Sequence, residues 1–241
     1  DGSATTTSAT PESVANYLAQ HAQSHACSTL ARRLVAIDRA HAVRGLSSPT
    51  DSPLVRTTLQ GIRRARGGAV RQVAALQKAD LLKMLRGLEG LRGLRDRALL
   101  LLGFAAALRR SELVGLDVTD VCYVDAGMVI RLRKSKTDQE GRGREIAIPN
   151  VRGPNNPCRA LKKWLEGADI REGAIFRRIS RGNTVLSQRL SGQAVAMIIK
   201  RRAMDAGLDP RLFSGHSLRA GFVTNAAKRG ATPSSIREQT G

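Results

Sequence analysis

The stretch LRGLRDRALLLLGFAAALRRSEL, residues 91–113, decides the fold of this chain. Its middle part, residues 98–107, is almost entirely apolar. A helix that is apolar on every side is buried inside a domain, so we expect a central buried helix over residues 91–108. The polar run RRSE, residues 109–112, follows at once. The chain therefore passes from its core directly into a cluster of charged side chains.

The composition of the whole chain indicates a globular protein with a polyanionic partner. Its 241 residues include 40 Lys and Arg against 20 Asp and Glu, and 41% are hydrophobic. A net charge of +20 favours nucleic acid over a membrane surface as the partner. No apolar run reaches the roughly 18 residues that a membrane span needs. The three widely spaced cysteines fit neither a disulfide framework nor a zinc site, which favours a cytoplasmic location.

The front of the chain predicts a small helical domain. Apolar side chains recur at helical spacing in three segments, which begin near a Thr10 cap, a Ser28 cap and Leu54. A basic stretch broken by Gly67 and Gly68 follows, and its arginines are Arg63, Arg64, Arg66 and Arg71. We interpret it as a linker that lies along a phosphate backbone, with a solvated run of charge as the alternative. Three short helices make a thin core, so we expect this domain to lack a first helix.

The rest of the chain predicts a larger domain with both helices and strands. Alternating apolar residues indicate two strands, at 128–132 and 145–148, joined by a charged loop that contains Lys134 and Lys136. Further helices are expected at residues 157–165 and 191–206, and a basic turn at 176–183. The polar face of the 191–206 helix carries Gln193, Lys200, Arg201 and Arg202. We therefore divide the chain into a domain at 1–66, a linker at 67–73 and a second domain at 74–241.

The run SGHSLR, residues 214–219, predicts a binding site for one phosphate. His216 and Arg219 are three residues apart and share a face if the run is helical. Gly215 suits a tight entry that brings backbone N–H groups of a helix N-terminus toward an anion. Taken alone, the pair also fits a solvated helix face. The phosphate-binding interpretation therefore depends on the other motifs of the chain.

The polar groups together favour phosphoryl transfer without a metal or a cofactor. Such a reaction needs its non-bridging oxygens neutralised, which arginine does well, and its leaving oxygen protonated, which a His or a Lys can do. The sequence shows neither a phosphate-binding glycine loop nor an aspartate cluster typical of magnesium sites.

Taken together, the motif LRRSEL at 108–113, Lys136 on its predicted hairpin and the motif HSLR at 216–219 resemble the tyrosine recombinases, the phage integrase family. The front half and residues 213–241 are most similar to the Cre-like branch. The resemblance implies a mainly α protein with a small antiparallel β-sheet. Its two domains, a helical core-binding domain and an α+β catalytic domain, would form a clamp around duplex DNA. It also implies self-association of the full-length protein into a DNA-bound dimer or tetramer.

The resemblance assigns roles residue by residue. Arg109 and Arg219 would clamp the scissile phosphate, and Glu112 would support Arg109. His216 would assist proton transfer, and Lys136 would protonate the departing 5′ oxygen. Lys134 stays open as an alternative, because residues two apart on an extended segment point the same way. The implied DNA contacts come from Arg32 and Arg33, from Arg178 and Arg181, and from the helix of Gln193, Lys200 and Arg201, which would enter the major groove.

One departure from the family concerns the nucleophile. The family uses a tyrosine about ten residues after a His or Trp that follows a Gly, whereas this sequence stops at Gly241. Its only tyrosines, Tyr17 and Tyr123, do not match that position. We therefore expect a truncated chain that binds DNA but does not cleave it. The alternatives are a non-catalytic DNA-binding regulator that keeps the phosphate site and a type IB topoisomerase, against which the small helical domain argues.

Overall fold

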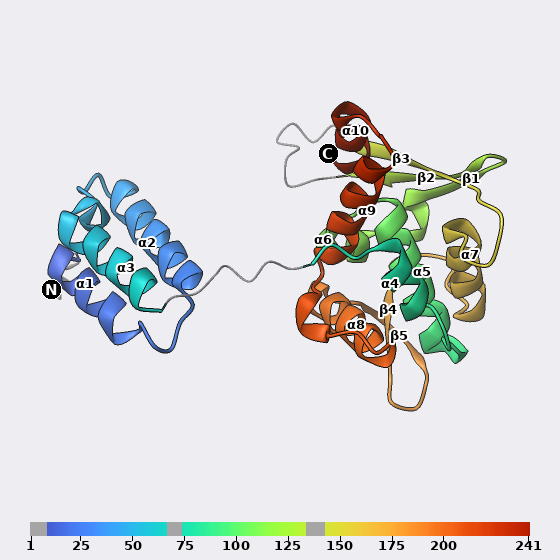
Figure 1. Cartoon of the computed structure of the whole chain (residues 1–241), viewed down its shortest axis with the longest axis horizontal. Coiled ribbons are helices and arrows are strands. Elements are labelled where there is room, and N and C mark those ends of the chain that lie inside the picture. The colour runs from blue at the N-terminus through green and yellow to red at the C-terminus, as the bar shows by residue number, and fades with distance from the viewer. Residues whose placement is uncertain (1–8, 67–73, 134–142) are drawn as a thin grey trace, which may run out of the picture. The chain divides into compact units, whose positions relative to one another are not determined.

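The computed structural model describes residues 9–66, 74–133 and 143–241. They belong to two compact units, which divide between residues 71 and 72 (Figure 1). Both units are mainly helical, and the second also holds small antiparallel sheets. Within the described ranges, no helix combines the length and the apolar character needed to cross a membrane.

The first unit is a small bundle of three α-helices. Its elements are α1 (Pro11–Gln20), α2 (Cys27–Ala42), the short 3-10 helix η1 (Pro49–Asp51) and α3 (Pro53–Ala65). Leu18, Leu30 and Val55, one from each α-helix, are completely buried against one another. Thr10 caps α1 as predicted, but Ser28 does not cap α2, whose N-cap is Ala26 and which begins at Cys27, two residues earlier than a Ser28 cap implies.

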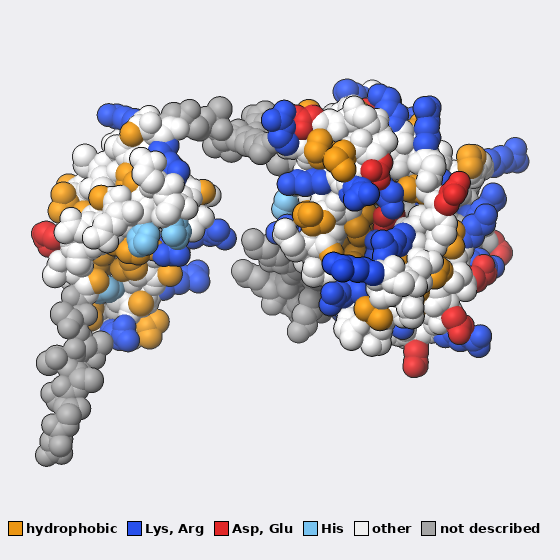
Figure 2. Space-filling model, turned by 90° about the horizontal axis from the view of Figure 1, so that it is seen from below, with side chains coloured by type: hydrophobic (Ala, Val, Ile, Leu, Met, Phe, Trp, Pro, Cys, Tyr) orange, Lys and Arg blue, Asp and Glu red, His pale blue; other side chains and the backbone are white. Residues whose placement is uncertain are grey.

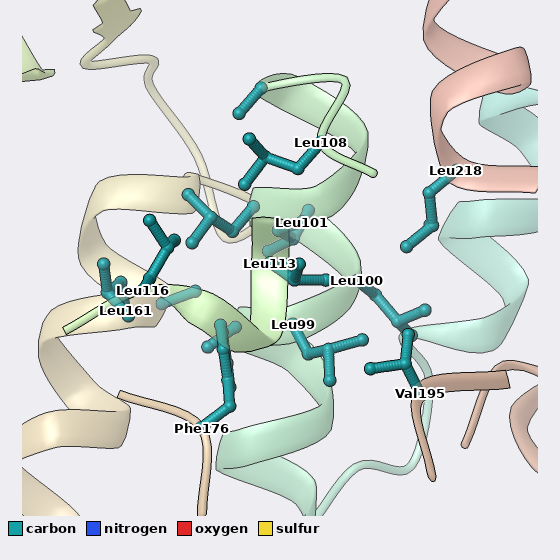
Figure 3. Close-up of a cluster of buried hydrophobic side chains, with 14 of the residues drawn as sticks. Leu99, Leu100, Leu101, Leu108, Leu113, Leu116, Leu161, Phe176, Val195 and Leu218 are labelled. Carbon is teal, nitrogen blue, oxygen red and sulfur yellow. The ribbon is translucent and has the colours of Figure 1, made fainter. Parts of the chain in front are cut away.

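The second unit is built around α5 (Gly90–Ala105). Its other elements in chain order are α4 (Lys78–Met84), α6 (Arg110–Gly115), the 3-10 helix η2 (Val118–Asp120), β1 (Val121–Val124), β2 (Gly127–Leu132), β3 (Arg144–Pro149), α7 (Pro157–Gly167), β4 (Arg177–Ile179), β5 (Val185–Arg189), α8 (Gly192–Asp205), the 3-10 helix η3 (Pro210–Leu212), α9 (Ser217–Lys228) and α10 (Pro233–Thr240). Helices α7 and α9 both pack against α5. Figure 3 shows Leu99, Leu100 and Leu101 of α5 in a cluster that Leu113 joins from α6 and Leu218 from α9.

The central helix ends earlier than its apolar run predicts. We expected it to reach residue 108, but α5 stops at Ala105 and Ala107 takes a left-handed backbone with φ 51°. The turn lets Leu108, only 1% exposed, continue into the core. Arg109 then becomes the N-cap residue of α6, immediately before the helix begins at Arg110. A backbone reversal, rather than a continuous helix, therefore positions the polar cluster.

The three-stranded sheet has the order β1-β2-β3 and is antiparallel throughout. The register pairs Met128 with Ile148 and Ile130 with Ile146, and these four side chains are buried on one face. Both strands predicted by alternation are present. The predicted basic turn at 176–183 contains β4 and then the turn that leads into β5, with which β4 pairs in a second hairpin.

Helix α8 lies within one residue of the predicted boundaries at each end, and its N-cap is Ser191, whose Oγ accepts the Ala194 N–H at 3.1 Å. Gln193, Lys200 and Arg201 are exposed, as expected. Arg202 is not exposed as we expected. Its side chain is only 19% exposed and pairs with the buried Asp96 of α5 at 2.6 Å.

Candidate active site

Arg109 and Glu112 form a rigid pair at the start of α6. One carboxylate oxygen of Glu112 accepts the Arg109 backbone N–H at 2.8 Å, and the other accepts the Arg109 guanidinium at 2.7 Å. The Glu112 side chain is 5% exposed and that of Arg109 19%. Charge-assisted bonds of this kind are stronger than neutral ones, especially away from water. The carboxylate therefore fixes both the backbone and the side chain of Arg109.

The second motif enters α9 through a tight turn. Ser214 Oγ accepts the backbone N–H of His216 at 3.1 Å, and the fully buried Ser217 Oγ accepts that of Ser214 at 3.0 Å. Gly215 is needed here for close approach, because a Cβ on it would lie 2.8 Å from Cδ of Arg110. His216 is the residue just before α9 and is exposed. Its ring has no hydrogen-bond partner among the residues that the structure describes.

Arg219 brings this motif back to the first one. Its Nη1 donates to the carbonyl oxygen of Ala107, in the left-handed turn before Arg109, at 3.0 Å. Burial lowers the pKa of the Arg219 guanidinium, and the positive charge of Arg109 lowers it further. Two guanidiniums are therefore held close together at a partly dehydrated place.

The two arginines meet at one oxygen atom. Arg109 Nη2 and Arg219 Nη2 each donate to the carbonyl oxygen of Gly241 at 3.1 Å. Arg219 Nη1 also donates to the carbonyl oxygen of Thr240 at 2.5 Å. Donors from residues 110 positions apart in sequence thus surround a small group of electronegative oxygens. Such convergence is what recognition of a phosphate requires.

Arg144 is a member of this cluster that the sequence analysis missed. It begins β3, and its Nη1 donates to the carbonyl oxygen of Gln239 at 3.0 Å. Its Nη2 lies 3.8 Å from a Glu112 carboxylate oxygen. Burial lowers the pKa of Arg144, while Glu112 acts in the opposite direction. A signal was present in the sequence, since Arg144 alternates with Ile146 and Ile148 and so belongs to the buried face of its strand.

The structure places the predicted DNA contacts on exposed surfaces of both units. In the first unit Arg32, Arg63 and Arg64 are exposed. In the second unit Arg178 lies on β4, Arg181 follows it, and Gln193, Lys200 and Arg201 lie on α8, all exposed. Figure 2 shows Lys and Arg side chains over much of the viewed face of the larger unit. Lys136, Lys134 and Arg71 lie outside the described residues.

Two of these arginines also have partners within the first unit. Arg33 donates to the hydroxyl of Tyr17 and lies 2.9 Å from His25 Nε2. Arg66 donates to the backbone carbonyl oxygens of His25 and, at 3.0 Å, of Gln23. Both side chains therefore help to hold the loop between α1 and α2.

Comparison with known proteins identifies the family to which this chain belongs. The phage integrase family matches residues 74–241, and the chain therefore belongs to this family, the tyrosine recombinases. It is 40% identical over 238 residues to the integrase/recombinase xerD homolog of Selenomonas ruminantium, covering 96% of this chain and 70% of the relative. Recombinase cre of Escherichia phage P1 is 25% identical over 254 residues, covering 97% and 73%.

Solved structures share the fold. The XerH site-specific recombinase bound to palindromic difH substrate superposes with a TM-score of 0.64 at 14% identity, over 96% of this chain. The lambda integrase(75-356) dimer bound to a COC' core site gives a TM-score of 0.58 at 19% identity, over the whole chain. This chain spans 65% of the XerH chain and 81% of that lambda integrase chain.

Proposed function

We propose that this chain binds duplex DNA and holds a scissile phosphate for strand cleavage and exchange, as part of a site-specific recombinase. The observation that carries the proposal is that Arg109 and Arg219 donate to the same oxygen, that of Gly241. Two guanidiniums held in this way can bind two non-bridging oxygens of one phosphate and neutralise the charge that builds up on them. The DNA-bound solved structures of the same fold are consistent with this partner.

Each remaining group has a role in the proposed reaction. A tyrosine hydroxyl attacks phosphorus and gives up its proton to a base, for which His216 is the candidate, while the bond to the 5′ oxygen breaks, which leaves a 3′-phosphotyrosine. Lys136 gives its proton to the departing 5′ oxygen, and His216, exposed beside Arg219, donates a hydrogen bond to the phosphate. Glu112 keeps Arg109 oriented and does not itself contact the phosphate. No step in this sequence calls on a metal or a cofactor.

The rest of the duplex is proposed to lie against the exposed basic residues. The exposed face of α8 presents Gln193 and Lys200, and such a helix fits the major groove, where an amide side chain can read adenine. Arg32, Arg63 and Arg64 of the first unit would contact the backbone. The net charge of +20 supports binding that depends mainly on phosphates.

The salt dependence of DNA binding tests this proposal. With six or more phosphates contacted, affinity for a short duplex should fall by about 10³-fold or more between 50 and 200 mM salt. Arg219→Gln should lower both the affinity and the slope, by about 0.9 in log–log units for one lost phosphate contact. Arg171→Gln, an equal loss of charge at a side chain that is 88% exposed, is the matched control and should leave the slope unchanged. A flat salt dependence of the unaltered chain would contradict the proposal.

A further inference from the structure

Arg144 is a charged residue at a largely buried position. It starts β3 on the same strand face as Ile146 and Ile148, which are 1% and 2% exposed. Its own side chain is 16% exposed. Charged groups at such places are normally paired and fully hydrogen-bonded, because removing them from water is costly.

The hydrogen bonds of Arg144 leave most of its guanidinium unused. Nη1 donates to the carbonyl oxygen of Gln239. Nε and Nη2 are buried, and neither has a hydrogen-bond partner in the described part of the chain. Nη2 has only the ion pair with Glu112 at 3.8 Å, which is too long for a hydrogen bond. Two nitrogens with donor capacity therefore remain beside a carboxylate whose oxygens are already engaged by Arg109.

The Arg144 guanidinium lies next to the point where the other two arginines converge. Arg144, Arg219 and Arg109 donate in turn to the carbonyl oxygens of residues 239, 240 and 241. A Cβ added to Gly241 would lie 2.7 Å from Arg144 Nη1, so this guanidinium touches the residue that the other two hold. Three guanidiniums and one carboxylate leave a net charge of about +2 at a partly dehydrated place, which attracts a dianion or a DNA phosphate.

We propose that Arg144 is a third phosphate-binding arginine of this site and donates through Nε and Nη2 to the DNA phosphate held by Arg109 and Arg219. The inference rests on the proposed function, because it names a further binding residue at the same site. A purely structural role, in which Arg144 links β3 to α10, accounts for the hydrogen bond from Nη1 to Gln239. It does not account for the other two nitrogens, which a phosphate oxygen would satisfy.

The test compares the salt dependence of binding to a short duplex of random sequence, since phosphate contacts do not depend on base sequence. Arg144→Gln should reduce the log–log slope by about 0.9, as Arg219→Gln does, because each removes one phosphate contact. Arg131→Gln is the matched control on the neighbouring strand, with a side chain that is 71% exposed and paired with Glu145. It should leave the slope unchanged.

The outcomes separate this inference from the proposed function. A wild-type slope that is steep, falls with Arg219→Gln and stays the same with Arg144→Gln would overturn the role of Arg144 alone. A wild-type slope that is flat would overturn the proposed function and the inference together.

A second measurement uses the unaltered chain and so does not depend on whether Arg144→Gln folds. In the unaltered chain labelled with 15N-arginine, the Nε–Hε resonance of Arg144, assigned with Arg144→Lys, should shift when the duplex is added. The resonance of Arg131 should stay in place. If the Arg219 resonance shifts while that of Arg144 does not, Arg144 only links β3 to α10 and does not bind the phosphate.

Discussion

Glu112 is the residue on which the geometry of the site depends. Its carboxylate is 5% exposed, accepts two hydrogen bonds from Arg109 and lies 3.8 Å from Arg144. It is the negative charge that faces both of these guanidiniums. Removing one partner of a buried ion pair is strongly destabilising, because the other charge stays buried without compensation.

Glu112→Gln should therefore lower the free energy of unfolding of the second unit by about 3–5 kcal/mol. The measurement is urea unfolding followed by fluorescence of Trp164, the only tryptophan of the chain, which is completely buried in this unit. Glu145→Gln removes the same charge from an exposed pair with Arg131 and should cost at most about 1 kcal/mol. Equal, small effects of the two substitutions would contradict the central role given to Glu112.

At the scale of elements, the site exists because α9 lies very close to the segment before α4. A Cβ on Gly221 would lie 2.2 Å from the carbonyl oxygen of Leu76 and 3.0 Å from Cε2 of Phe104. The Leu76 N–H in turn donates to the carbonyl oxygen of Ser217 at 3.1 Å. The glycine thus allows a backbone contact that sets the position of α9, and with it that of Arg219.

Gly221→Ala should destabilise the second unit by about 1–3 kcal/mol, although alanine is the better helix former, because the obstacle is backbone that cannot move aside alone. Gly115→Ala is the matched control at the end of α6, where a Cβ meets nothing within 4 Å. It should be neutral or stabilising. Thermal unfolding followed by Trp164 fluorescence compares the two, and a neutral Gly221→Ala would show that α9 can shift freely.

Much of this element structure follows from local sequence signals. Thr10 caps α1 where its position predicts, and alternation correctly indicates β2 and β3. The early end of α5 does not follow, because the left-handed backbone of Ala107 is imposed by the packing of Leu108 and not by a glycine. The sequence pattern did not indicate the hairpin of β4 and β5, because both strands are short and rich in polar residues.

For the site, sequence reasoning selected the residues with recognisable spacing. Arg109, Glu112 and Arg219 were predicted, and the structure brings them together. Arg144 was counted with the charged loop before it, although its alternation with Ile146 and Ile148 placed it inside. That signal is weak, because one charged residue at the end of a strand is common and only tertiary contacts show what it faces.

At the scale of the whole molecule, the chain consists of two units that carry different parts of the proposed function. The first has a small core centred on Leu18, Leu30 and Val55 and exposes several arginines. The second contains the whole described guanidinium cluster, from Arg109 to Arg219. All the described residues proposed to bind the phosphate therefore belong to the second unit, and the exposed arginines of the first unit would add further contacts to the DNA.

The proposed cleavage, unlike phosphate binding, needs a tyrosine at the cluster, and in the described part of the second unit no tyrosine is a hydrogen-bond partner of Arg109, Arg144 or Arg219. Tyr17 belongs to the first unit and accepts a hydrogen bond from Arg33. Tyr123 lies on β1, where partial burial, with smaller effects from Cys158 and Glu166, raises its pKa to about 12.

The 241-residue chain should therefore bind a nicked duplex, a substrate that traps covalent intermediates, without forming a covalent adduct. Denaturing electrophoresis of the mixture should show free protein and intact DNA strands, while a native gel of the same mixture shows the complex. The native gel is the internal control, because it separates failure to react from failure to bind. If an adduct does appear and Tyr123→Phe abolishes it, the nucleophile comes from β1, and the reaction does not take place at the cluster of Arg109 and Arg219.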